Sequence, residues 1–333
     1  MQKILTVTIP AYNVEKYIEK CLDSMILGQA YMDMLEILVI DDGGTDNTAE
    51  IVRRKYVKRY PDSIHFFHKE NAGHGSVINF GIAHACGKYF KIVDGDDWLN
   101  TNEIQNFLEL LSKVNYDIIA SDYQCIEDGT YKLLRQMDAT GDPKKYGKSG
   151  KISDGFADRV IKMHSMTIRT DILKKMPMSI DENCFYVDAE YITYPIPWAE
   201  TLYYDQRNLY RYRLGRSGQS MEIKSMQQRH NQHLNVLHSL EKFYDNLPEL
   251  PAQKKYYIER CIAQVVENEF QIAISMGTKP GVQVWLRAND IKLKNNYPNI
   301  WKATKKKSIV LLRKTNYRIL PFSEIIFRIV KSH

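Results

Sequence analysis

Three carboxylates fall within four positions in the stretch Asp94-Gly95-Asp96-Asp97, directly after a strand-like run at 89–93. Like charges at the end of a buried strand repel one another and are costly to desolvate, so they need a cation or solvent. Asp94 and Asp96 fall on the same side of an extended segment, and Gly95 lets the backbone turn between them. These oxygen ligands suit a hard divalent cation carrying a substrate diphosphate. The alternative is a solvated turn with a helix cap, because Asp and Gly are ordinary turn residues.

Three further polar clusters follow predicted strands in the same part of the chain. They are residues 10–13 after the strand 3–9, residues 41–44 after the strand 35–40, and residues 71–75 after the strand 64–68. Helical patterns at 14–27, 45–60 and 77–86 separate the strands. This alternation predicts a parallel α/β sheet with right-handed crossovers, in which ligands bind at the carboxyl ends of the strands. Four clusters at one sheet edge favour a ligand site over four unrelated loops.

The pattern changes after Trp98. We expect a helix at 103–111, strands at 117–121 and 130–135, a mobile loop at 138–150, a helix at 154–162, and strands at 165–169, 201–204 and 208–214. Long helical patterns follow at 225–244, 252–276 and 281–293, which places a domain boundary near residue 222.

The composition is that of a globular protein, with 44% hydrophobic and 26% charged residues among 333. The net charge of +6 is uneven, because nine Lys or Arg and no acidic residue lie between Asp290 and Glu324. Five scattered cysteines without a C-x-x-C pair argue against a disulfide framework or a zinc site and favour a reducing compartment. The chain shows no signal-peptide core and no apolar run long enough to span a bilayer, so we expect a cytoplasmic protein.

The ordered motifs resemble a known family. The segments VTIPAYNVEKYIEKCLDSM, EILVIDDGGTDNTAEI and KENAGHGSVINFGIAHACGKYFKIVDGDDWL resemble family 2 glycosyltransferases with a GT-A fold, over roughly residues 3–215. The resemblance implies an α/β fold of the nucleotide-diphospho-sugar transferase type, a Rossmann-like mixed sheet with a C-terminal helical extension. We expect a catalytic domain at 1–222, with a nucleotide-binding half (1–98) and an acceptor-binding half (99–222). Residues 223–333 form a helical region with a basic, apolar tail.

The resemblance also implies a donor site. Its residues are Pro10, Tyr12, Asn13, Asp42, Asn71, Gly73, Gly75, Asp94, Asp96, Arg213 and Arg216. The ring of Tyr12 would pack near the base, and the Asp42 carboxylate would accept from a uracil N–H. The alternatives are a strand-end anchor for Tyr12 and a turn former for Asp42. The glycines let the backbone approach the nucleotide.

The Asp94-Gly95-Asp96 triplet matches the family's DxD motif. By this resemblance Asp96 is the direct ligand of Mn²⁺ or Mg²⁺, and Asp94 contacts the ribose or a metal-bound water. Asp97 is either a helix N-cap or support for the other two. In the segment LYRYRLGRSGQSM, Arg213 and Arg216 would carry positive charge over the diphosphate, and the alternative for each is a solvated strand end.

A general base is expected about ninety residues beyond the DxD motif, in the segment FYVDAEYITYP. Asp188 is the candidate. The family's preceding Glu is Val187 here, Glu190 is a nearby alternative, and the other role open to Asp188 is a helix N-cap. A base opposite the leaving group implies inversion at the anomeric carbon. His164 lies where relatives present acceptor-side residues, and its alternative is a packed core histidine.

The predicted function is that of an inverting glycosyltransferase. It would move a sugar from a UDP-sugar to a hydroxyl of a surface-glycan acceptor, which is a polysaccharide, a lipid-linked glycan or a glycoprotein glycan. The rival hypothesis is a catalytically weak nucleotide-sugar-binding subunit of a larger enzyme, motivated by Val187. A nucleotidyltransferase would need a basic Gly-rich loop near the first strand, and IPAYNVEKY has none.

The basic, apolar segment 302–333 predicts a peripheral contact with anionic lipids at the inner face of the membrane. The alternative is packing on its own domain or on a second subunit in a homo-oligomer. We do not expect nucleic-acid binding. The chain has no Q-x-x-R-W segment and no set of membrane spans, which argues against a processive polysaccharide synthase.

Overall fold

The computed structural model describes residues 3–216, 219, 222–276 and 281–320. Its contacts divide the chain into two compact units, Met1–Ser217 and Gly218–His333. The boundary expected from the sequence lies five residues later, at 222.

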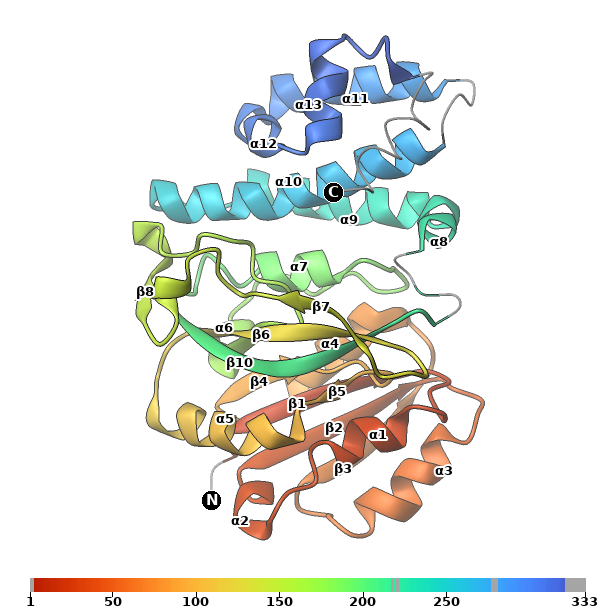
Figure 1. The fold of residues 1–333 in the computed structure, drawn as a ribbon, viewed down its shortest axis with the longest axis vertical. Helices are drawn as coiled ribbons and strands as arrows, with labels where there is room; N and C mark the ends of the chain where they lie inside the picture. The colour runs from red at the N-terminus through yellow and green to blue at the C-terminus, as the bar shows by residue number, and fades with distance from the viewer. Residues whose placement is uncertain (1–2, 217–218, 220–221, 277–280, 321–333) are drawn as a thin grey trace. The chain divides into compact units, whose positions relative to one another are not determined.

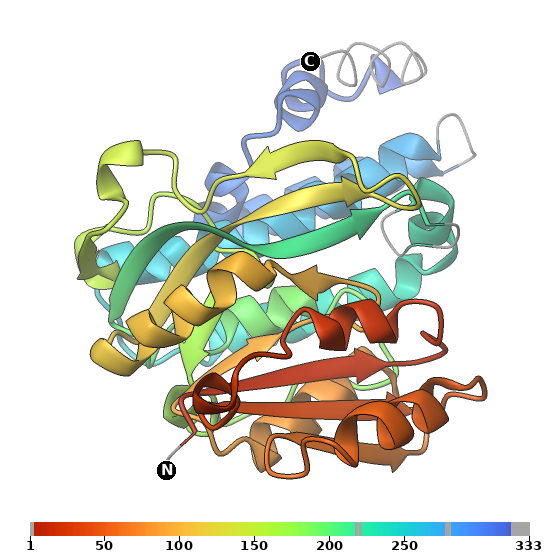
Figure 2. The same cartoon turned by 60° about the horizontal axis from the view of Figure 1, so that its bottom comes forward.

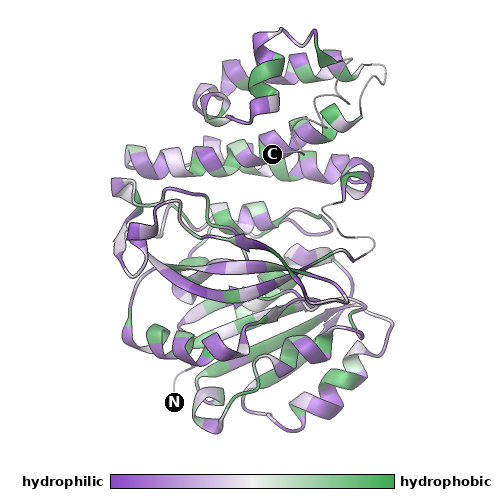
Figure 3. Cartoon of the chain, viewed as in Figure 1, coloured by the Kyte–Doolittle hydropathy of each residue, from purple (hydrophilic) through white to green (hydrophobic). Residues whose placement is uncertain are grey.

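The first unit is built on a sheet whose first half is parallel. Its strands are β1 (Leu5–Ala11), β2 (Leu35–Asp42), β3 (Ile64–Lys69) and β4 (Tyr89–Ile92), in the order β3-β2-β1-β4. In register, Leu5 pairs with Leu35 and with Tyr89, and β1 and β2 lie side by side (Figure 1, Figure 2). Every residue of β2 is buried, and both strands are coloured mainly as hydrophobic in Figure 3. Strands that are covered on both faces have continuous apolar runs in their sequences, which is why these strands could be predicted.

The second half makes the sheet mixed. Here β9 (Met166–Arg169) is antiparallel to β4 and to β6 (Ile118–Glu127), and β10 (Thr201–Leu214) is parallel to β6. Strand β5 (Trp98–Leu99) pairs antiparallel with the end of β10. Two short strands, β7 (Leu133–Met137) and β8 (Ser149–Lys151), add to β6 and β10. This mixed α/β sheet is the fold class that the sequence predicted.

Helices cover both faces of the parallel half. One face packs against α1 (Ile18–Asp23), α2 (Gln29–Met32), the π-helical turn Arg53–Val57 after α3 (Thr48–Val52), and α5 (Thr101–Lys113). The opposite face packs against α4 (Gly73–His84), through Val77 and Phe80 on Leu38 and Ile40. Two short helices, α6 (Thr170–Leu173) and α7 (Asp188–Thr193), follow later in the chain.

Three sequence expectations are wrong in their local detail. The helix expected at 154–162 is absent, because Gly155 takes a left-handed conformation (φ 77°) directly after a single 3₁₀ turn at Ile152–Asp154. The helix expected from residue 77 begins at Gly73, where a carboxylate from β2 caps its first N–H groups. The two strands expected at 201–204 and 208–214 are one strand, β10, with a bulge between Asp205 and Asn208.

The second unit is helical. It comprises α8 (Ile223–Gln228), α9 (His230–Asp245), α10 (Ala252–Ser275), α11 (Val282–Asn296), α12 (Pro298–Ala303) and α13 (Lys307–Lys314). Apolar and polar residues alternate along α9 and α10 in Figure 3, as expected for amphipathic helices. Within the described ranges no helix is long and apolar enough to cross a membrane. Residues 321–333 of the predicted basic tail lie outside the described residues.

Candidate active site

The loops after β1 and β2 are tied together by side chains that accept hydrogen bonds from backbone. Asn13 has a left-handed backbone (φ 53°), and its Oδ1 accepts from the N–H groups of Thr45, at 2.8 Å, and Asp46, at 3.3 Å. In return, an Asp46 carboxylate oxygen accepts from the Glu15 N–H at 2.9 Å. Asn13 therefore helps to fix the shape of the sheet edge where a ligand is predicted to bind.

Asp42 ends β2 and is only 5% exposed. Its Oδ1 accepts from the Lys69 Nζ at 2.7 Å and from the Ala72 N–H at 3.1 Å, and its Oδ2 accepts from the Gly73 N–H at 2.8 Å. The carboxylate thus caps α4 and neutralises the positive end of the helix dipole. The contact with a nucleobase stays a prediction, and it would share oxygens that already have these partners.

Residues 10–13 and 94–97 meet at the same edge. The Gly95 N–H donates to the Pro10 carbonyl at 3.1 Å, and a Cβ at position 95 would lie 2.8 Å from that oxygen. Only glycine therefore fits between Asp94 and Asp96 in this loop. The Tyr12 side chain is 54% exposed beside this contact, which leaves its ring free to stack on a planar group.

Gly73 and Gly75 make room for a later segment of the chain. A Cβ on Gly75 would lie 2.0 Å from the Asp181 carbonyl oxygen, and one on Gly73 would lie 3.2 Å from the Asn183 nitrogen. The Asn183 N–H also donates to the Ala72 carbonyl at 2.6 Å. These glycines, predicted to line the nucleotide wall together with the exposed Asn71, here position the segment that leads to α7.

The acidic loop is anchored from β10. The Tyr210 hydroxyl donates to the Asp97 carboxylate at 2.6 Å and accepts from the Asp94 N–H at 3.2 Å. The other Asp97 oxygen accepts from the Arg213 N–H at 2.7 Å. Burial and the charges of its two neighbouring aspartates raise the pKa of Asp97 well above its ordinary range. Asp97, only 1% exposed, therefore holds the loop in place.

Asp94 and Asp96 make different ion pairs. Asp94 lies 3.0 Å from the His74 Nε2, and Asp96 lies 3.0 Å from an Arg216 Nη. Burial opposes the charge on Asp94, but the hydrogen bond and charge of His74 hold its pKa below the ordinary value. Burial and the charge of Asp94 raise the pKa of Asp96, although Arg216 opposes this. The Arg216 Nε has no hydrogen-bond partner among the described residues.

The two arginines predicted to cover a diphosphate differ in their surroundings. Arg213 is 2% exposed, its Nε donates to the Asp96 carbonyl at 2.6 Å, and its Nη1 pairs with Asp128 at 2.8 Å. It also lies over the ring of Trp98, at 4.8 Å. Arg213 is therefore built into the wall of the site. The Arg216 side chain is 32% exposed; it pairs with Asp96 and lies over the Tyr17 ring at 5.4 Å, so it has more freedom to change partner.

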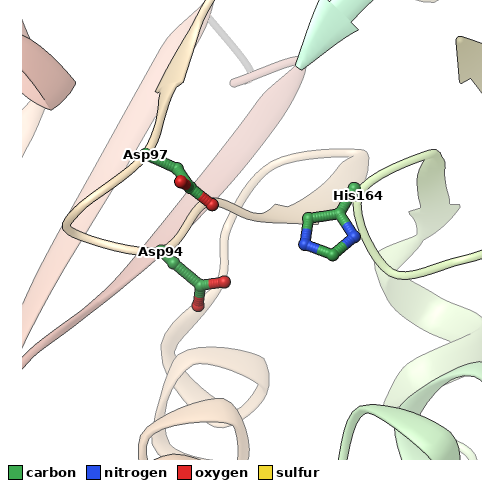
Figure 4. A group of neighbouring side chains, drawn as sticks. All are labelled: Asp94, Asp97 and His164. Carbon is green, nitrogen blue, oxygen red and sulfur yellow. The ribbon is translucent and has the colours of Figure 1, made fainter. Parts of the chain in front are cut away.

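The acidic loop offers ligands for a cation. One ligand atom each from Asp94, Asp97 and His164 lies within 4.8 Å of the others (Figure 4). Burial lowers the pKa of His164 to about 4, so its imidazole is neutral and able to ligate. Carboxylates and a neutral imidazole suit Mn²⁺, and carboxylates suit Mg²⁺. A cation here would also relieve the mutual repulsion of the aspartates.

The two candidate bases lie in contrasting surroundings. Asp188 is exposed at the first position of α7. Although burial opposes it, the hydrogen bond and charge of Asp94 raise the pKa of His74, and the charge of Asp188 adds to this effect, so Asp188 lies near the same cluster. Glu190 is 0% exposed, and its Oε2 accepts from the Asp181 N–H at 2.8 Å. Burial raises the pKa of Glu190 to about 8. Glu190 is therefore protonated at neutral pH and shapes the turn instead of facing a substrate.

Sequence reasoning missed Tyr210 and Asp128. Both act through pairings between distant parts of the chain, since Tyr210 in β10 pairs with Leu99 in β5, and Asp128 follows β6. No local motif signals such contacts. The one sequence feature near Tyr210 is the run of aromatic and basic residues in LYRYR, and this run is equally typical of an ordinary strand.

Comparisons with known proteins show what this chain is similar to. The family model described as "Glycosyl transferase family 2" matches residues 6–176. An uncharacterized glycosyltransferase of Mycoplasma pneumoniae is 36% identical over 124 residues, which cover 37% of this chain and 40% of that protein. Glycosyltransferase GlyA of Streptococcus pneumoniae is 36% identical over 119 residues, or 36% of this chain and 16% of that protein. The matched segments thus span less than half of these relatives.

Two solved structures share the fold. TarS of S. aureus in complex with UDP-GlcNAc superposes with a TM-score of 0.64 at 17% identity, covering 96% of this chain and 91% of TarS. The mannosyltransferase PcManGT from Pyrobaculum calidifontis, in complex with GDP-Man and Mn²⁺, gives a TM-score of 0.50 at 15% identity, over 100% of this chain and 89% of that one. These likenesses support the GT-A fold predicted from the sequence.

Proposed function

The chain belongs to glycosyl transferase family 2, and we propose that it transfers a sugar from a UDP-sugar to a hydroxyl group of a glycan acceptor, with inversion and with help from a divalent cation. The observation that carries the proposal is the acidic loop 94–97, held by β10 at the sheet edge where the loops after β1 and β2 meet. The related folds hold UDP-GlcNAc in TarS and GDP-Man with Mn²⁺ in PcManGT. We choose UDP because the family resemblance assigns the Asp42 carboxylate to a uracil N–H, a contact that it would share with Lys69, Ala72 and Gly73.

Asp94 and Asp96 would hold Mn²⁺ or Mg²⁺, whose positive charge stabilises the negative charge that grows on the departing nucleoside diphosphate. Asp97 is the least available of the three carboxylates, because Tyr210 and the Arg213 N–H already occupy its oxygens. His164 lies close enough to Asp94 to serve as a further ligand. Asp96 is not in the group of close ligand atoms formed by Asp94, Asp97 and His164, so its place in the proposed pair rests on the family resemblance.

Arg216 supplies a second source of positive charge. In the structure it pairs with Asp96 at 3.0 Å, and its Nε has no hydrogen-bond partner among the described residues. A guanidinium can bind two phosphate oxygens at once. When a diphosphate enters, Arg216 would exchange the Asp96 carboxylate for phosphate oxygens and leave Asp96 free to ligate the cation.

Asp188 is the proposed general base. Its carboxylate takes the proton of the acceptor hydroxyl while the hydroxyl oxygen bonds to the anomeric carbon and the bond from that carbon to the diphosphate oxygen breaks. The electron pair of the broken bond stays on the diphosphate. Attack from the side opposite the leaving group inverts the anomeric carbon. The buried, protonated Glu190 cannot take this role at neutral pH.

A panel of sugar nucleotides with detection of the released nucleoside diphosphate tests this function. We expect release from one UDP-sugar, dependent on Mn²⁺ or Mg²⁺ and abolished by a chelator. The Asp188→Asn variant should bind UDP like the wild type while transfer collapses. Release that a chelator leaves unchanged would contradict the role of the cation, and near-normal transfer by Asp188→Asn would contradict the assigned base.

A second function is favoured by one observation, the Val187 that replaces the family's Glu before Asp188. The protein could instead be a weakly active nucleotide-sugar-binding subunit of a larger glycosyltransferase. Purified protein that binds UDP with metal but transfers to no acceptor would favour this alternative. Transfer restored by a partner glycosyltransferase from the same cell would establish it.

We also propose a peripheral contact with the inner face of the cytoplasmic membrane through the basic C-terminal segment. Lys307, Leu311 and Lys314 of α13 are exposed at helical spacing, and Leu311 is 43% exposed. The double variant Lys307→Glu, Lys314→Glu should lose binding to vesicles containing anionic phosphatidylglycerol. Equal binding of both proteins would refute this contact and leave a second subunit as the partner of this surface.

A further inference from the structure

A cavity of about 770 Å³ opens in the first unit beside the bulge of β10. Its lining includes Asp122, Tyr146, Asp205 and Asn208, and it includes none of the residues assigned above to the donor, the cation or the base. Asp205 and Tyr210 are five residues apart on β10, so the cavity lies up to roughly 16 Å along the strand from the acidic loop. Its lining thus shares no residue with the proposed reaction centre.

Asp205 lies in the wall of this cavity, and one of its carboxylate oxygens lacks a donor within the described part of the chain. The residue is only 5% exposed, and one carboxylate oxygen accepts from the Arg207 Nη1 at 2.7 Å. The other oxygen, Oδ2, is buried and has no hydrogen-bond partner among the described residues. A buried carboxylate oxygen without a donor is unfavourable, so rotation of the Asp205 carboxylate toward a ligand in the cavity would supply the missing hydrogen bond. The bulge between Asp205 and Asn208 turns the strand locally at this position.

Asp122 on the neighbouring strand adds a second fixed acceptor. It is 3% exposed, and its Oδ1 accepts from the Ala139 N–H at 2.8 Å and the Tyr146 hydroxyl at 2.7 Å. Both hydrogen bonds use the same oxygen, which leaves Oδ2 able to accept from another donor. The two buried carboxylates come from adjacent strands, because Asn208 pairs with Asp122 across β6 and β10. They are therefore held by the sheet and not by a surface loop.

The charge of the lining restricts the class of ligand. The cavity is lined by four carboxylates and two guanidinium groups, which belong to Glu103, Asp122, Asp138 and Asp205, and to Arg159 and Arg207. The excess of negative charge disfavours phosphate and other anions. Carboxylates and amides that accept from hydroxyl groups, beside a Tyr ring, suit a neutral saccharide. Across the described residues, the one group of three close metal-ligating side chains is Asp94, Asp97 and His164, so nothing indicates a cation here.

We propose that this cavity binds one saccharide unit of a glycan, with Asp122 and Asp205 accepting from its hydroxyl groups. The inference deepens the proposed function and rests on it for its purpose, because a second contact would retain an acceptor chain whose end lies at the reaction centre. Binding itself requires no transfer. A direct binding assay can therefore fail or succeed independently of the catalytic proposal.

The test measures binding of triacetylchitotriose, maltotriose and mannotriose to the full chain by ligand-observed NMR and calorimetry. Trigalacturonate serves as the anionic probe, and CaCl₂ alone as the cation probe. The variants are Asp205→Asn and Asp122→Asn, which keep the shape of each side chain. The control variant is Asp154→Asn, an exposed carboxylate in the same unit that does not line the cavity. Thermal unfolding of each variant checks that it is folded.

We expect one neutral trisaccharide to bind in the millimolar range and each cavity variant to weaken it about tenfold, as loss of a charge-assisted hydrogen bond would. Asp154→Asn should bind like the wild type. Three results would overturn the proposal: no neutral trisaccharide binds, binding is equal in the cavity variants, or trigalacturonate binds more tightly than the neutral sugars. If the protein binds calcium and both cavity variants abolish that binding, the ligand of the cavity is a cation and the saccharide proposal is wrong. Failure of UDP release with intact saccharide binding would instead count against the proposed function.

Discussion

The Tyr210 hydroxyl links the two aspartates that flank the proposed cation ligand Asp96. It donates to the Asp97 carboxylate at 2.6 Å and accepts from the Asp94 N–H at 3.2 Å, in a residue that is 0% exposed. The substitution Tyr210→Phe removes one oxygen atom and keeps the ring. It leaves a buried carboxylate oxygen and a buried N–H without their partner.

Each orphaned polar group costs about 1–3 kcal/mol, and because the two share one hydroxyl we expect a total loss of about 2–4 kcal/mol of unfolding free energy. For a unit of this size that corresponds to a fall of roughly 5–15 °C in the unfolding temperature. The acidic loop also loses its anchor to β10, so UDP should bind more weakly in the presence of Mn²⁺. Both changes have the same cause.

The matched control is Tyr191→Phe. Tyr191 is also 0% exposed, but its hydroxyl has no hydrogen-bond partner among the described residues, so its removal should be neutral or slightly stabilising. Urea unfolding followed by fluorescence gives the two free energies, and calorimetry gives the UDP affinity. If Tyr210→Phe loses no more stability than Tyr191→Phe, the hydroxyl does not anchor the loop and the reasoning fails.

The remaining predictions concern other parts of the same site. Gly75→Ala should lower the unfolding temperature sharply, because its Cβ would lie 2.0 Å from the Asp181 carbonyl oxygen. The control Gly28→Ala, whose Cβ would have no atom within 4 Å, should not. Equal effects would show that the segment 180–184 moves aside at little cost in stability. Burial raises the pKa of Glu190 to about 8. Between the ordinary Glu pKa and about pH 8, the folded state therefore keeps a proton that the unfolded state has lost. The free energy of unfolding of the wild type falls as the pH rises through this range. The unfolding temperature of Glu190→Gln relative to wild type should therefore rise between pH 5 and pH 8; a constant difference would contradict the assigned pKa. Arg216→Gln should weaken UDP binding with little change in unfolding temperature, whereas Arg213→Gln, which orphans Asp128, should unfold at a lower temperature; the reverse pattern would exchange the two roles.

The sequence predicted the parallel half of the sheet well because its strands are buried on both faces. An apolar run such as LEILVIDD in β2 has one reading only, and the turn residues that follow it mark the site edge. The family resemblance then indicated which side chains to examine. Tyr12, Asn13 and Asp42 lie at the ends of β1 and β2. The close approach of Gly95 to Pro10 was not predicted.

The sequence could not predict how charged groups divide their partners. From the sequence, Arg213 and Arg216 had the same two possible roles, yet Arg213 is buried against Asp128 while Arg216 is partly exposed. The difference depends on the pairing of β10 with β5, which joins residues more than a hundred positions apart. The bulge that brings Asp205 to the second cavity is likewise a property of strand pairing and has no local signal.

The measurement that tests the account most directly is calorimetric titration of UDP into the protein with and without Mn²⁺, for the wild type and for Asp96→Asn. We predict that the wild type binds UDP tightly only when Mn²⁺ is present, and that Asp96→Asn loses this dependence while unfolding at a similar temperature. Equal UDP affinity with and without Mn²⁺, or unchanged Mn²⁺-dependent affinity in Asp96→Asn, would contradict the assignment of the acidic loop as the cation and diphosphate site.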